Sequence, residues 1–239
     1  MKNRPLTICI LAAGKGNRMK SATPKVLHEI NGKPMIHHVL NTAKKLQPEK
    51  IIIVVGFKKE LVINSTKDFG VSFATQNEQK GTAHAVQQCN IELNNFKGNL
   101  LVLSGDVPLI TQNTLMTLIE THNTENSKGS ILSTYFNNPF GYGRIVRDEN
   151  NNFKKIVEHK DANEQELNIT EINSGTYIFD CETLFKKINL IKNNNSQSEY
   201  YLTDIFDYLQ NEDISVVLTK KNQEIYGINT IEQLNELKK

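Results

Sequence analysis

The chain has 239 residues, of which 38% are hydrophobic and 23% are charged, and its formal net charge is only +2. This composition is typical of a globular protein and excludes a disordered or fibrous one. A net charge so close to zero provides no broad electrostatic grip on nucleic acid or on an anionic membrane, so we expect neither as a partner.

The cysteines and the first apolar run indicate the cellular compartment of the protein. Cys9, Cys89 and Cys181 stand far apart and are odd in number, so we expect buried free thiols in a reducing compartment. The apolar run over residues 6–13 is too short for a signal peptide or a membrane span. We therefore expect a cytoplasmic protein.

The first half of the chain predicts alternating strands and helices. Residues 6–13 are almost continuously apolar, as in a strand that is buried on both faces, and apolar residues at helical spacing follow over 35–46. Further strands are predicted at 51–55, 71–74 and 100–103, and further helices at 59–66 and 82–89. This alternation predicts a Rossmann-like, doubly wound α/β fold with a mostly parallel sheet, whose ligands bind beyond the carboxyl ends of the strands.

The second half has a different texture and predicts a smaller, partly antiparallel lobe. Short strands separated by turns are expected at 130–135, 143–147, 153–157 and 176–179, and the Asn-rich stretch 192–196 is expected to be a loop. We predict a single domain over 1–239, with a first half over about 1–125, a second lobe over about 126–229 and a C-terminal helix over about 230–239.

The first strand runs into a loop that could hold a phosphate. Two glycines, Gly14 and Gly16, follow the buried strand, and a turn of this kind exposes successive backbone N–H groups in a concave nest for phosphate oxygens. Arg18 and Lys25 follow closely and would supply positive charge. Glycine at such a turn also has a purely steric explanation, so this fragment alone leaves both interpretations open.

Two familiar phosphate loops do not match. The dinucleotide-binding fingerprint needs a third glycine where this chain has Met19, and no Gly-Lys-Ser/Thr follows four spacer residues as the P-loop requires. The loop therefore belongs to a third class.

A series of motifs across nearly the whole chain resembles the sugar-nucleotide pyrophosphorylases, and in particular the uridylyltransferase domain of bacterial UDP-N-acetylglucosamine pyrophosphorylases. The motifs are Leu11 to Met19 with Pro24-Lys25, Gln76 through Gly81-Thr82-Ala83-His84-Ala85, Gly105-Asp106-Val107-Pro108-Leu109, Gly141-Tyr142-Gly143-Arg144-Ile145, and the segments 157–162, 171–175, 199–204 and 227–229. Their joint occurrence in this order is far more specific than any one of them.

The resemblance implies a reaction and a set of site residues. It implies that UTP and N-acetylglucosamine 1-phosphate give UDP-N-acetylglucosamine and pyrophosphate with the help of Mg²⁺. It further implies catalysis by Arg18 and Lys25, Mg²⁺ binding by Asp106 and Asn229, sugar binding by Gly143, Glu158 and Asn173, and nucleotide binding by Leu11, Ala12, Ala13, Gly14, Gln76, Gly81, Thr82, Ser104 and Gly105.

The residues themselves are compatible with these roles. In-line attack on a phosphorus atom needs positioning and charge neutralisation and requires no nucleophilic side chain. Mg²⁺ takes few protein oxygens besides phosphate and water, so one carboxylate and one amide suffice. Taken alone, Asp106 could be a turn residue and Asn229 a helix cap.

Alternatives remain open at the level of the sequence. The glycine loop alone would also suit a nucleotidyltransferase with another triphosphate or another phosphate acceptor, and a non-catalytic sensor of a sugar nucleotide is a further hypothesis. Bifunctional relatives carry a β-helix of hexapeptide repeats that acetylates glucosamine 1-phosphate and supports trimers, and this sequence has no such repeat. We therefore expect no acetyltransferase activity and a monomer or weak oligomer, either as a standalone enzyme or as the first part of a longer one.

Overall fold

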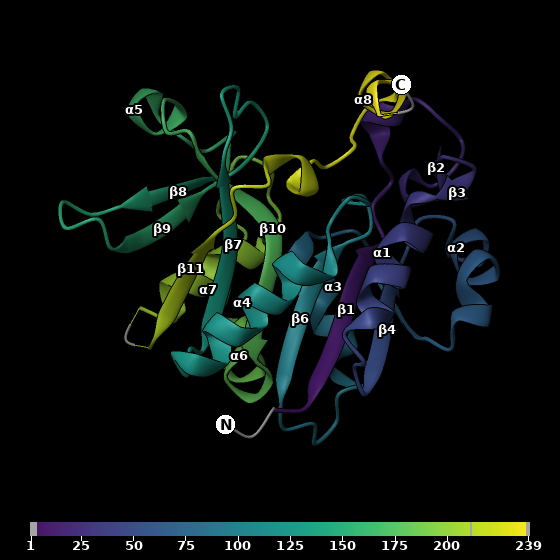
Figure 1. Cartoon of the computed structure of the whole chain (residues 1–239), viewed down its shortest axis with the longest axis horizontal. Coiled ribbons are helices and arrows are strands. Elements are labelled where there is room, and N and C mark those ends of the chain that lie inside the picture. The colour runs from purple at the N-terminus through teal and green to yellow at the C-terminus, as the bar shows by residue number, and fades with distance from the viewer. Residues whose placement is uncertain (1–3, 211, 238–239) are drawn as a thin grey trace.

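A single large sheet organises the molecule. The computed structural model describes residues 4–210 and 212–237. Within them a nine-stranded sheet has a main path of seven strands (Figure 1). In spatial order these are β11 (Ile214–Leu218), β7 (Gly129–Tyr135), β10 (Glu171–Asp180), β6 (Asn99–Ser104), β1 (Leu6–Ala12), β4 (Lys50–Val55) and β5 (Ser72–Thr75).

The sheet is mostly parallel, as the sequence predicts. β1 pairs in parallel with β4 and β6, β4 with β5, and β7 with β11, whereas β10 runs antiparallel to β6 and β7. The antiparallel hairpin of β8 (Arg144–Arg147) and β9 (Phe153–Val157) joins the sheet beside β10. β7, β10 and β11 extend the sheet that β1 starts, so the predicted second lobe shares it, and the boundaries near 125 and 229 stay predictions.

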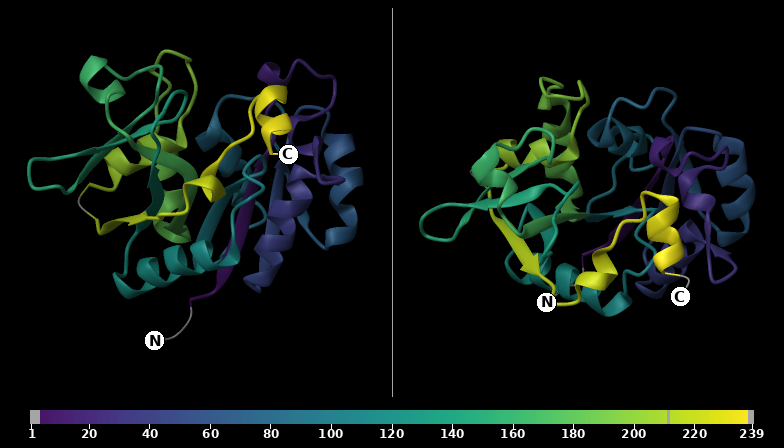
Figure 2. Two further views of the ribbon diagram at one scale, coloured as in Figure 1. Left: turned by 45° about the horizontal axis from the view of Figure 1, so that its top comes forward. Right: turned by 90° about the horizontal axis from the view of Figure 1, so that it is seen from above.

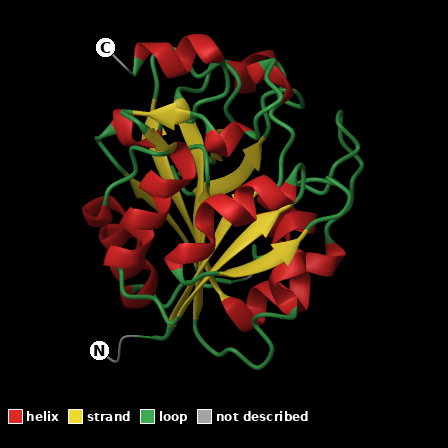
Figure 3. Cartoon of the chain, turned by 90° about the vertical axis from the view of Figure 1, so that its right-hand side faces the viewer, coloured by secondary structure: helices red, strands yellow, loops and turns green. Residues whose placement is uncertain are grey.

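Helices cover both faces of this sheet (Figure 3). Side chains of successive strand residues point to opposite faces, so Ile8 and Ile10 of β1 pack in one hydrophobic cluster and Cys9 in the other. The first cluster includes α1 (Met35–Lys45), α2 (Lys59–Thr66) and α4 (Gln112–Thr124), and the second includes α3 (Thr82–Gln87), α6 (Cys181–Lys187) and α7 (Ile205–Tyr208). This is the doubly wound arrangement that the alternation of elements predicts.

The predicted helices form because their apolar residues recur at helical spacing and pack on one face. α1 buries Met35, Ile36, Val39, Leu40 and Ala43 on one face, and α2 has the predicted bounds. α3 is shorter than predicted and continues as a 3₁₀ turn over Gln88–Asn90. α5 (Glu164–Leu167) begins with a capping box, in which the Asn163 side chain accepts from the Glu166 N–H. Residues 192–196 form a loop, as expected.

The C-terminal segment returns to the start of the chain. α8 (Ile231–Glu236) forms a third cluster in which Ile228 and Leu234 pack on Met19, Ile30 and Met35. Both views of Figure 2 show this helix beside the segment that follows β1, next to the small hairpin of β2 (Glu29–Ile30) and β3 (Lys33–Pro34). A helix was predicted over about 230–239; α8 lies within this range and ends at Glu236, and the last two positions lie outside the described residues. No described helix is long and apolar enough to cross a bilayer.

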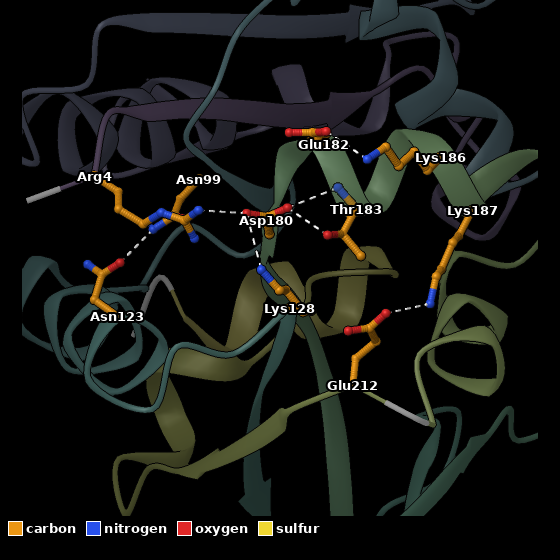
Figure 4. Close-up of polar contacts among 10 residues, drawn as sticks. All are labelled: Arg4, Asn99, Asn123, Lys128, Asp180, Glu182, Thr183, Lys186, Lys187 and Glu212. Carbon is orange, nitrogen blue, oxygen red and sulfur yellow. Dashed lines mark hydrogen bonds and ion pairs between the residues drawn. The ribbon is translucent and has the colours of Figure 1, made fainter.

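A network of polar side chains stabilises the end of the sheet at which β1 begins (Figure 4). Asp180 caps α6 by accepting from the Thr183 N–H at 2.9 Å, and its second oxygen accepts from Arg4 at 2.8 Å and lies 3.9 Å from Lys128 Nζ. Since Arg4 precedes β1 and Lys128 precedes β7, one carboxylate joins three distant parts of the chain. The candidate site lies at the other end, at the carboxyl ends of the parallel strands.

Candidate active site

The loops that follow β1 and β6 lie side by side. Leu11 in β1 pairs with Ser104 in β6, and the Gly105 N–H donates to the Leu11 carbonyl at 3.0 Å. The next residue is Asp106, so its carboxylate stands beside the glycine loop of β1. Parallel strands end at the same edge of a sheet, which is why two motifs almost a hundred positions apart share one place.

The glycine loop offers free backbone donors. The N–H groups of Gly14, Lys15 and Gly16 donate no hydrogen bond to any residue in the described part of the chain. Gly16 has a φ of 63°, and a Cβ placed on it would lie 2.7 Å from the Lys25 Cβ. Glycine is therefore required here by both backbone angle and contact, because only its small size lets Lys25 pass close to the loop on its way into the site.

Four polar side chains from distant segments converge next to this loop. The Lys25 ammonium donates to the Asp106 carboxylate and, at 2.9 Å, to the Asn229 side-chain oxygen. The same oxygen accepts from the Arg18 guanidinium at 2.8 Å. Asn229 is held there because the Ile228 N–H donates to the Asp106 carbonyl at 3.0 Å and because α8 packs on Met19. The structure thus brings together the two predicted catalytic cations and the two predicted metal ligands.

A cavity of about 590 Å³ opens above the glycine loop. It contains ten of the predicted site residues, which come from the ends of β1, β5 and β6, from the start of α3 and from the loop that carries Lys25. These are Leu11, Ala12, Ala13, Gly14, Lys25, Gln76, Gly81, Thr82, Ser104 and Asp106. Its size and its lining of both apolar and polar groups suit a small ligand with an apolar and a charged part.

A second cavity of about 220 Å³ adjoins the first. The two share Leu11, Thr82, Ser104 and Asp106, so they meet at the Asp106 carboxylate. The remaining predicted residues Arg18, Gly143, Glu158, Asn173 and Asn229 line this second cavity. Gly105 lines neither, and its place is in the turn below, where it bonds to Leu11. Two neighbouring cavities with the ion-pair cluster at their junction can hold two ligands with their reacting ends in contact.

The second cavity is lined by buried groups that suit an uncharged polar ligand. Asn173 donates to the Tyr177 hydroxyl at 2.7 Å and accepts from the Gly175 N–H at 3.2 Å, at a bulge that interrupts β10. Glu158 accepts from the Thr203 hydroxyl at 3.1 Å, and burial raises the pKa of its carboxyl. Burial also raises the pKa of Tyr177 well above its usual value. Hydroxyl, amide and carboxyl groups at fixed positions are what recognition of a sugar requires.

Gln76 is fixed at the back of the first cavity. Its side chain is only 3% exposed, and its amide nitrogen donates to the Gly81 carbonyl at 3.0 Å and to His84 Nδ1 at 3.0 Å. Gly81 has a φ of 110°, and a Cβ on it would come within 2.5 Å of the Tyr200 carbonyl oxygen. Only glycine permits this approach, and it seats the segment around Tyr200 against α3, where the Ala83 N–H donates to the Tyr200 carbonyl.

Several residues contribute to the site without having been predicted for it. His84 contacts Gln76, Thr203 contacts Glu158, and the Tyr142 hydroxyl accepts from the Gly227 N–H at 3.1 Å. Each lies inside or beside one of the sequence motifs, which is the signal that could have found it. The motifs do not predict which residue each of these side chains contacts.

Comparisons with known proteins agree with this architecture. Residues 8–224 match the profile of the nucleotidyl transferase family. The bifunctional protein GlmU of Clostridium novyi (strain NT) is 48% identical over 228 residues, which are 95% of this chain and 50% of that protein. The bifunctional protein GlmU of Bacillus cereus (strain G9842) is 47% identical over 222 residues, 92% of this chain and 48% of that protein. The chain spans about half the length of the curated relatives it matches.

Solved structures share the fold. A putative glucose-1-phosphate thymidylyltransferase from Bacillus anthracis superposes with a TM-score of 0.73 at 21% identity and covers 98% of this chain and 94% of that one. HddC from Yersinia pseudotuberculosis, complexed with GMP-PN, superposes with a TM-score of 0.70 at 21% identity and covers 97% of each chain. At this identity the likeness is one of fold.

Proposed function

Since the chain belongs to the nucleotidyl transferase family, we propose that it transfers the uridylyl group of UTP to N-acetylglucosamine 1-phosphate. The products are UDP-N-acetylglucosamine and pyrophosphate. The observation that carries the proposal is the pair of cavities that meet at Asp106, one lined by the glycine loop with its free N–H groups and one at Glu158 and Asn173. Support also comes from the GlmU relatives, whose aligned part covers nearly the whole of this chain.

In our proposal the reacting atoms meet at the junction of the cavities. The triphosphate lies against the N–H groups of Gly14, Lys15 and Gly16, with the base toward Gln76. The sugar lies at Glu158 and Asn173, with its phosphate toward Asp106. A phosphate oxygen of the sugar then attacks the α-phosphorus of UTP in line, a new P–O bond forms, and the bond from the α-phosphorus to the bridging oxygen breaks. Pyrophosphate leaves with that electron pair.

Arg18 and Lys25 stabilise the charge that moves during this step. Negative charge grows on the leaving pyrophosphate, and fixed cations in a partly desolvated site stabilise it without reorganising. The Arg18 guanidinium can hold two phosphate oxygens in a fork, while Lys25 acts as a compact point charge. No side-chain nucleophile takes part, because the substrate phosphate itself is the nucleophile.

Asp106 and Asn229 are the residues that would hold Mg²⁺. They offer one carboxylate and one amide oxygen, and the described residues contain no cluster of three or more His, Cys, Asp or Glu side chains that could hold a metal ion by themselves. That fits Mg²⁺, which takes most of its ligands from phosphate and water, and when bound it neutralises charge on the triphosphate. Lys25 now donates to both side chains, and Arg18 donates to Asn229. In our proposal they give up these oxygens to the divalent ion and turn toward the phosphates.

The proposal includes where and in what form the enzyme works. We place it in the cytoplasm and expect a monomer or weak oligomer. The three thiols are free and buried, as expected of a reducing compartment.

A substrate panel tests the proposed function. The purified chain is incubated with each of UTP, CTP, GTP and dTTP, together with N-acetylglucosamine 1-phosphate, glucosamine 1-phosphate or glucose 1-phosphate, with Mg²⁺ or with EDTA. Pyrophosphate release is measured. We expect turnover for UTP with N-acetylglucosamine 1-phosphate, lost in EDTA. Preference for another triphosphate or another sugar phosphate would overturn the assignment, and tight binding of UDP-N-acetylglucosamine without turnover would instead indicate a sensor.

A further inference from the structure

We propose that Glu224 is a positioning residue, which holds the segment that carries Asn229 in register with the segment that carries Asp106, so that both side chains can bind one divalent ion. The inference rests on the proposed function for the identity of that ion. Glu224 lines neither cavity of the site. It lies in a 3₁₀ turn over Asn222–Ile225, a short distance before Asn229.

Glu224 joins this turn to the start of α4. One of its carboxylate oxygens accepts from the Thr111 hydroxyl at 2.8 Å, from the Thr114 hydroxyl at 2.6 Å and from the Thr111 N–H at 3.3 Å. Thr111 caps α4, and the chain reaches it directly from Asp106 through residues 107–110. Because the acceptor is ionised and the Glu224 side chain belongs to a residue that is only 9% exposed, these bonds form a strong link.

The buried carboxylate depends on its threonine donors. Burial opposes ionisation, but the hydroxyl groups of Thr114 and Thr111 bring the pKa of Glu224 below its usual value. The second carboxylate oxygen lies 3.3 Å from Lys221 Nζ. If the turn moved along α4, the carboxylate would lose these donors and stay desolvated, which is costly. The contact therefore fixes the turn at one place on α4.

A second link joins the same two segments at the site itself. The Ile228 N–H donates to the Asp106 carbonyl at 3.0 Å. Between the two links, Ile225 packs in one hydrophobic cluster with Val107 and Ile110. The two segments therefore run side by side in opposite directions, one leading away from the site and the other returning to it.

The link at the site would not fix the returning segment by itself. A single backbone hydrogen bond holds one point, and a rotation about it would move the Asn229 side chain relative to Asp106. Glu224 holds a second point on the stretch of chain that carries Asp106. The Tyr142 hydroxyl also contacts the returning segment, at Gly227, but it comes from the loop before β8 and does not join it to Asp106. Since Mg²⁺ demands nearly ideal octahedral geometry, a displaced ligand lowers its affinity.

Amide hydrogen exchange without any ligand tests the positioning directly. The exchange rate of the Ile228 N–H, measured by NMR, reports how firmly the two segments are held together. We expect Glu224→Ala to speed this exchange about tenfold or more, because several hydrogen bonds to a charged group are lost. Thr114→Val keeps the shape of the side chain and removes one donor, so it should cause a smaller increase.

Mn²⁺ binding tests the consequence for the metal site. It is measured by electron paramagnetic resonance with a non-hydrolysable UTP analogue, and UTP binding is measured separately in EDTA. Glu224→Ala should lower the Mn²⁺ affinity about tenfold or more, as expected when a group that orients a metal ligand is removed. The affinity for UTP in EDTA should stay unchanged, because the returning segment does not line the cavity at the glycine loop.

Glu171→Ala is the matched control. Glu171 is also a buried carboxylate, 4% exposed, and it accepts from the Ser133 hydroxyl and the Arg147 guanidinium. Its loss should leave both the Ile228 exchange rate and the Mn²⁺ affinity as they are in the wild type, although it removes as many hydrogen bonds. An effect of general destabilisation would instead appear in both variants.

The outcomes are distinct. Wild-type Ile228 exchange or wild-type Mn²⁺ affinity in a folded Glu224→Ala would overturn the inference, and so would an equal effect in Glu171→Ala. If Glu224→Ala does not fold, an unchanged Ile228 exchange rate in Thr114→Val would overturn it. Failure of the proposed function looks different, because the wild type would then bind Mn²⁺ with the UTP analogue, in a manner that depends on Glu224, and yet release no pyrophosphate.

Discussion

His122 should make the fold sensitive to mild acid. The side chain lies on α4, is 1% exposed, and bonds through Nδ1 to the Ser130 hydroxyl at 2.8 Å, while its Nε2 has no partner within the described residues. The pKa of His122 is lowered from its ordinary value of 6.5 to about 4, chiefly by burial, with a contribution from Arg4 and Lys128 of the network in Figure 4 that Asp180 opposes. The folded protein thus holds this imidazole neutral.

The size and sign of the effect follow from the two pKa values. Between the folded-state value of about 4 and the unfolded-state value of 6.5 the unfolded chain binds more protons, so the free energy of unfolding falls as the pH falls. A gap of about 2.5 units at roughly 1.36 kcal/mol each gives about 3.4 kcal/mol once the pH is below about 4, of which about 2 kcal/mol is already lost at about pH 5. The side chain is almost fully buried, so little of this is screened by solvent.

Urea unfolding of the wild type and His122→Gln, followed by circular dichroism because the chain has no tryptophan, measures the effect. A glutamine cannot take up a proton in this range. The difference in free energy of unfolding between wild type and variant should therefore shift by about 2 kcal/mol toward the variant from about pH 7.5 to about pH 5. His38→Gln on α1, at a half-buried histidine, controls for the substitution itself. A difference that stays constant over this range would refute the claim that the fold keeps His122 neutral.

Three other expectations concern the site and the thiols. Arg18→Ala should lower kcat about a hundredfold or more, on the scale of one lost transition-state contact, and near wild-type turnover in the pyrophosphate assay would remove Arg18 from catalysis. Lys25→Met should also lower kcat. In the absence of nucleotide this variant should bind Mn²⁺ more tightly, as measured by electron paramagnetic resonance, because the ammonium no longer occupies the oxygens of Asp106 and Asn229. Weaker Mn²⁺ binding would contradict the proposal that Lys25 gives up these oxygens to the metal ion. Hydrogen bonding to Cys89 and burial raise the pKa of the Cys9 thiol, and burial raises the pKa of the Cys181 thiol to about 12. Iodoacetamide at neutral pH should therefore label the native chain far more slowly than the unfolded chain. Equal labelling rates would show that these thiols are exposed.

The sequence predicts the central strands well and the polar elements poorly. β1, β4 and β6 are almost wholly apolar because helices cover both of their faces, and their bounds match the prediction to within about a residue. β10 was predicted only over 176–179, since buried polar residues such as Asn173 and Ser174 hide the strand before its bulge. α4 was not predicted, because two residues on its buried face are Thr114 and His122.

The candidate site is likewise predicted from the sequence only in part. Asp106 and the glycine loop follow strands of one parallel sheet, so general rules already place them together. Asn229 and Glu158 entered only through the resemblance. The position of Asn229 depends on the packing of α8 over Met19 and on the bond from Ile228 to Asp106, and these contacts join the C-terminal segment to distant parts of the chain. No periodicity in a single segment reports such a contact.

The central claim is that Arg18, Lys25, Asp106 and Asn229 act on one polyphosphate and one divalent ion. Mn²⁺ binding in the presence of a non-hydrolysable UTP analogue, measured by electron paramagnetic resonance in wild type and in Asp106→Asn, tests it most directly. The account predicts one nucleotide-dependent Mn²⁺ site per chain whose affinity falls about tenfold or more in Asp106→Asn, because a carboxylate ligand is replaced by an uncharged amide. Equal Mn²⁺ affinity in the two proteins would contradict it.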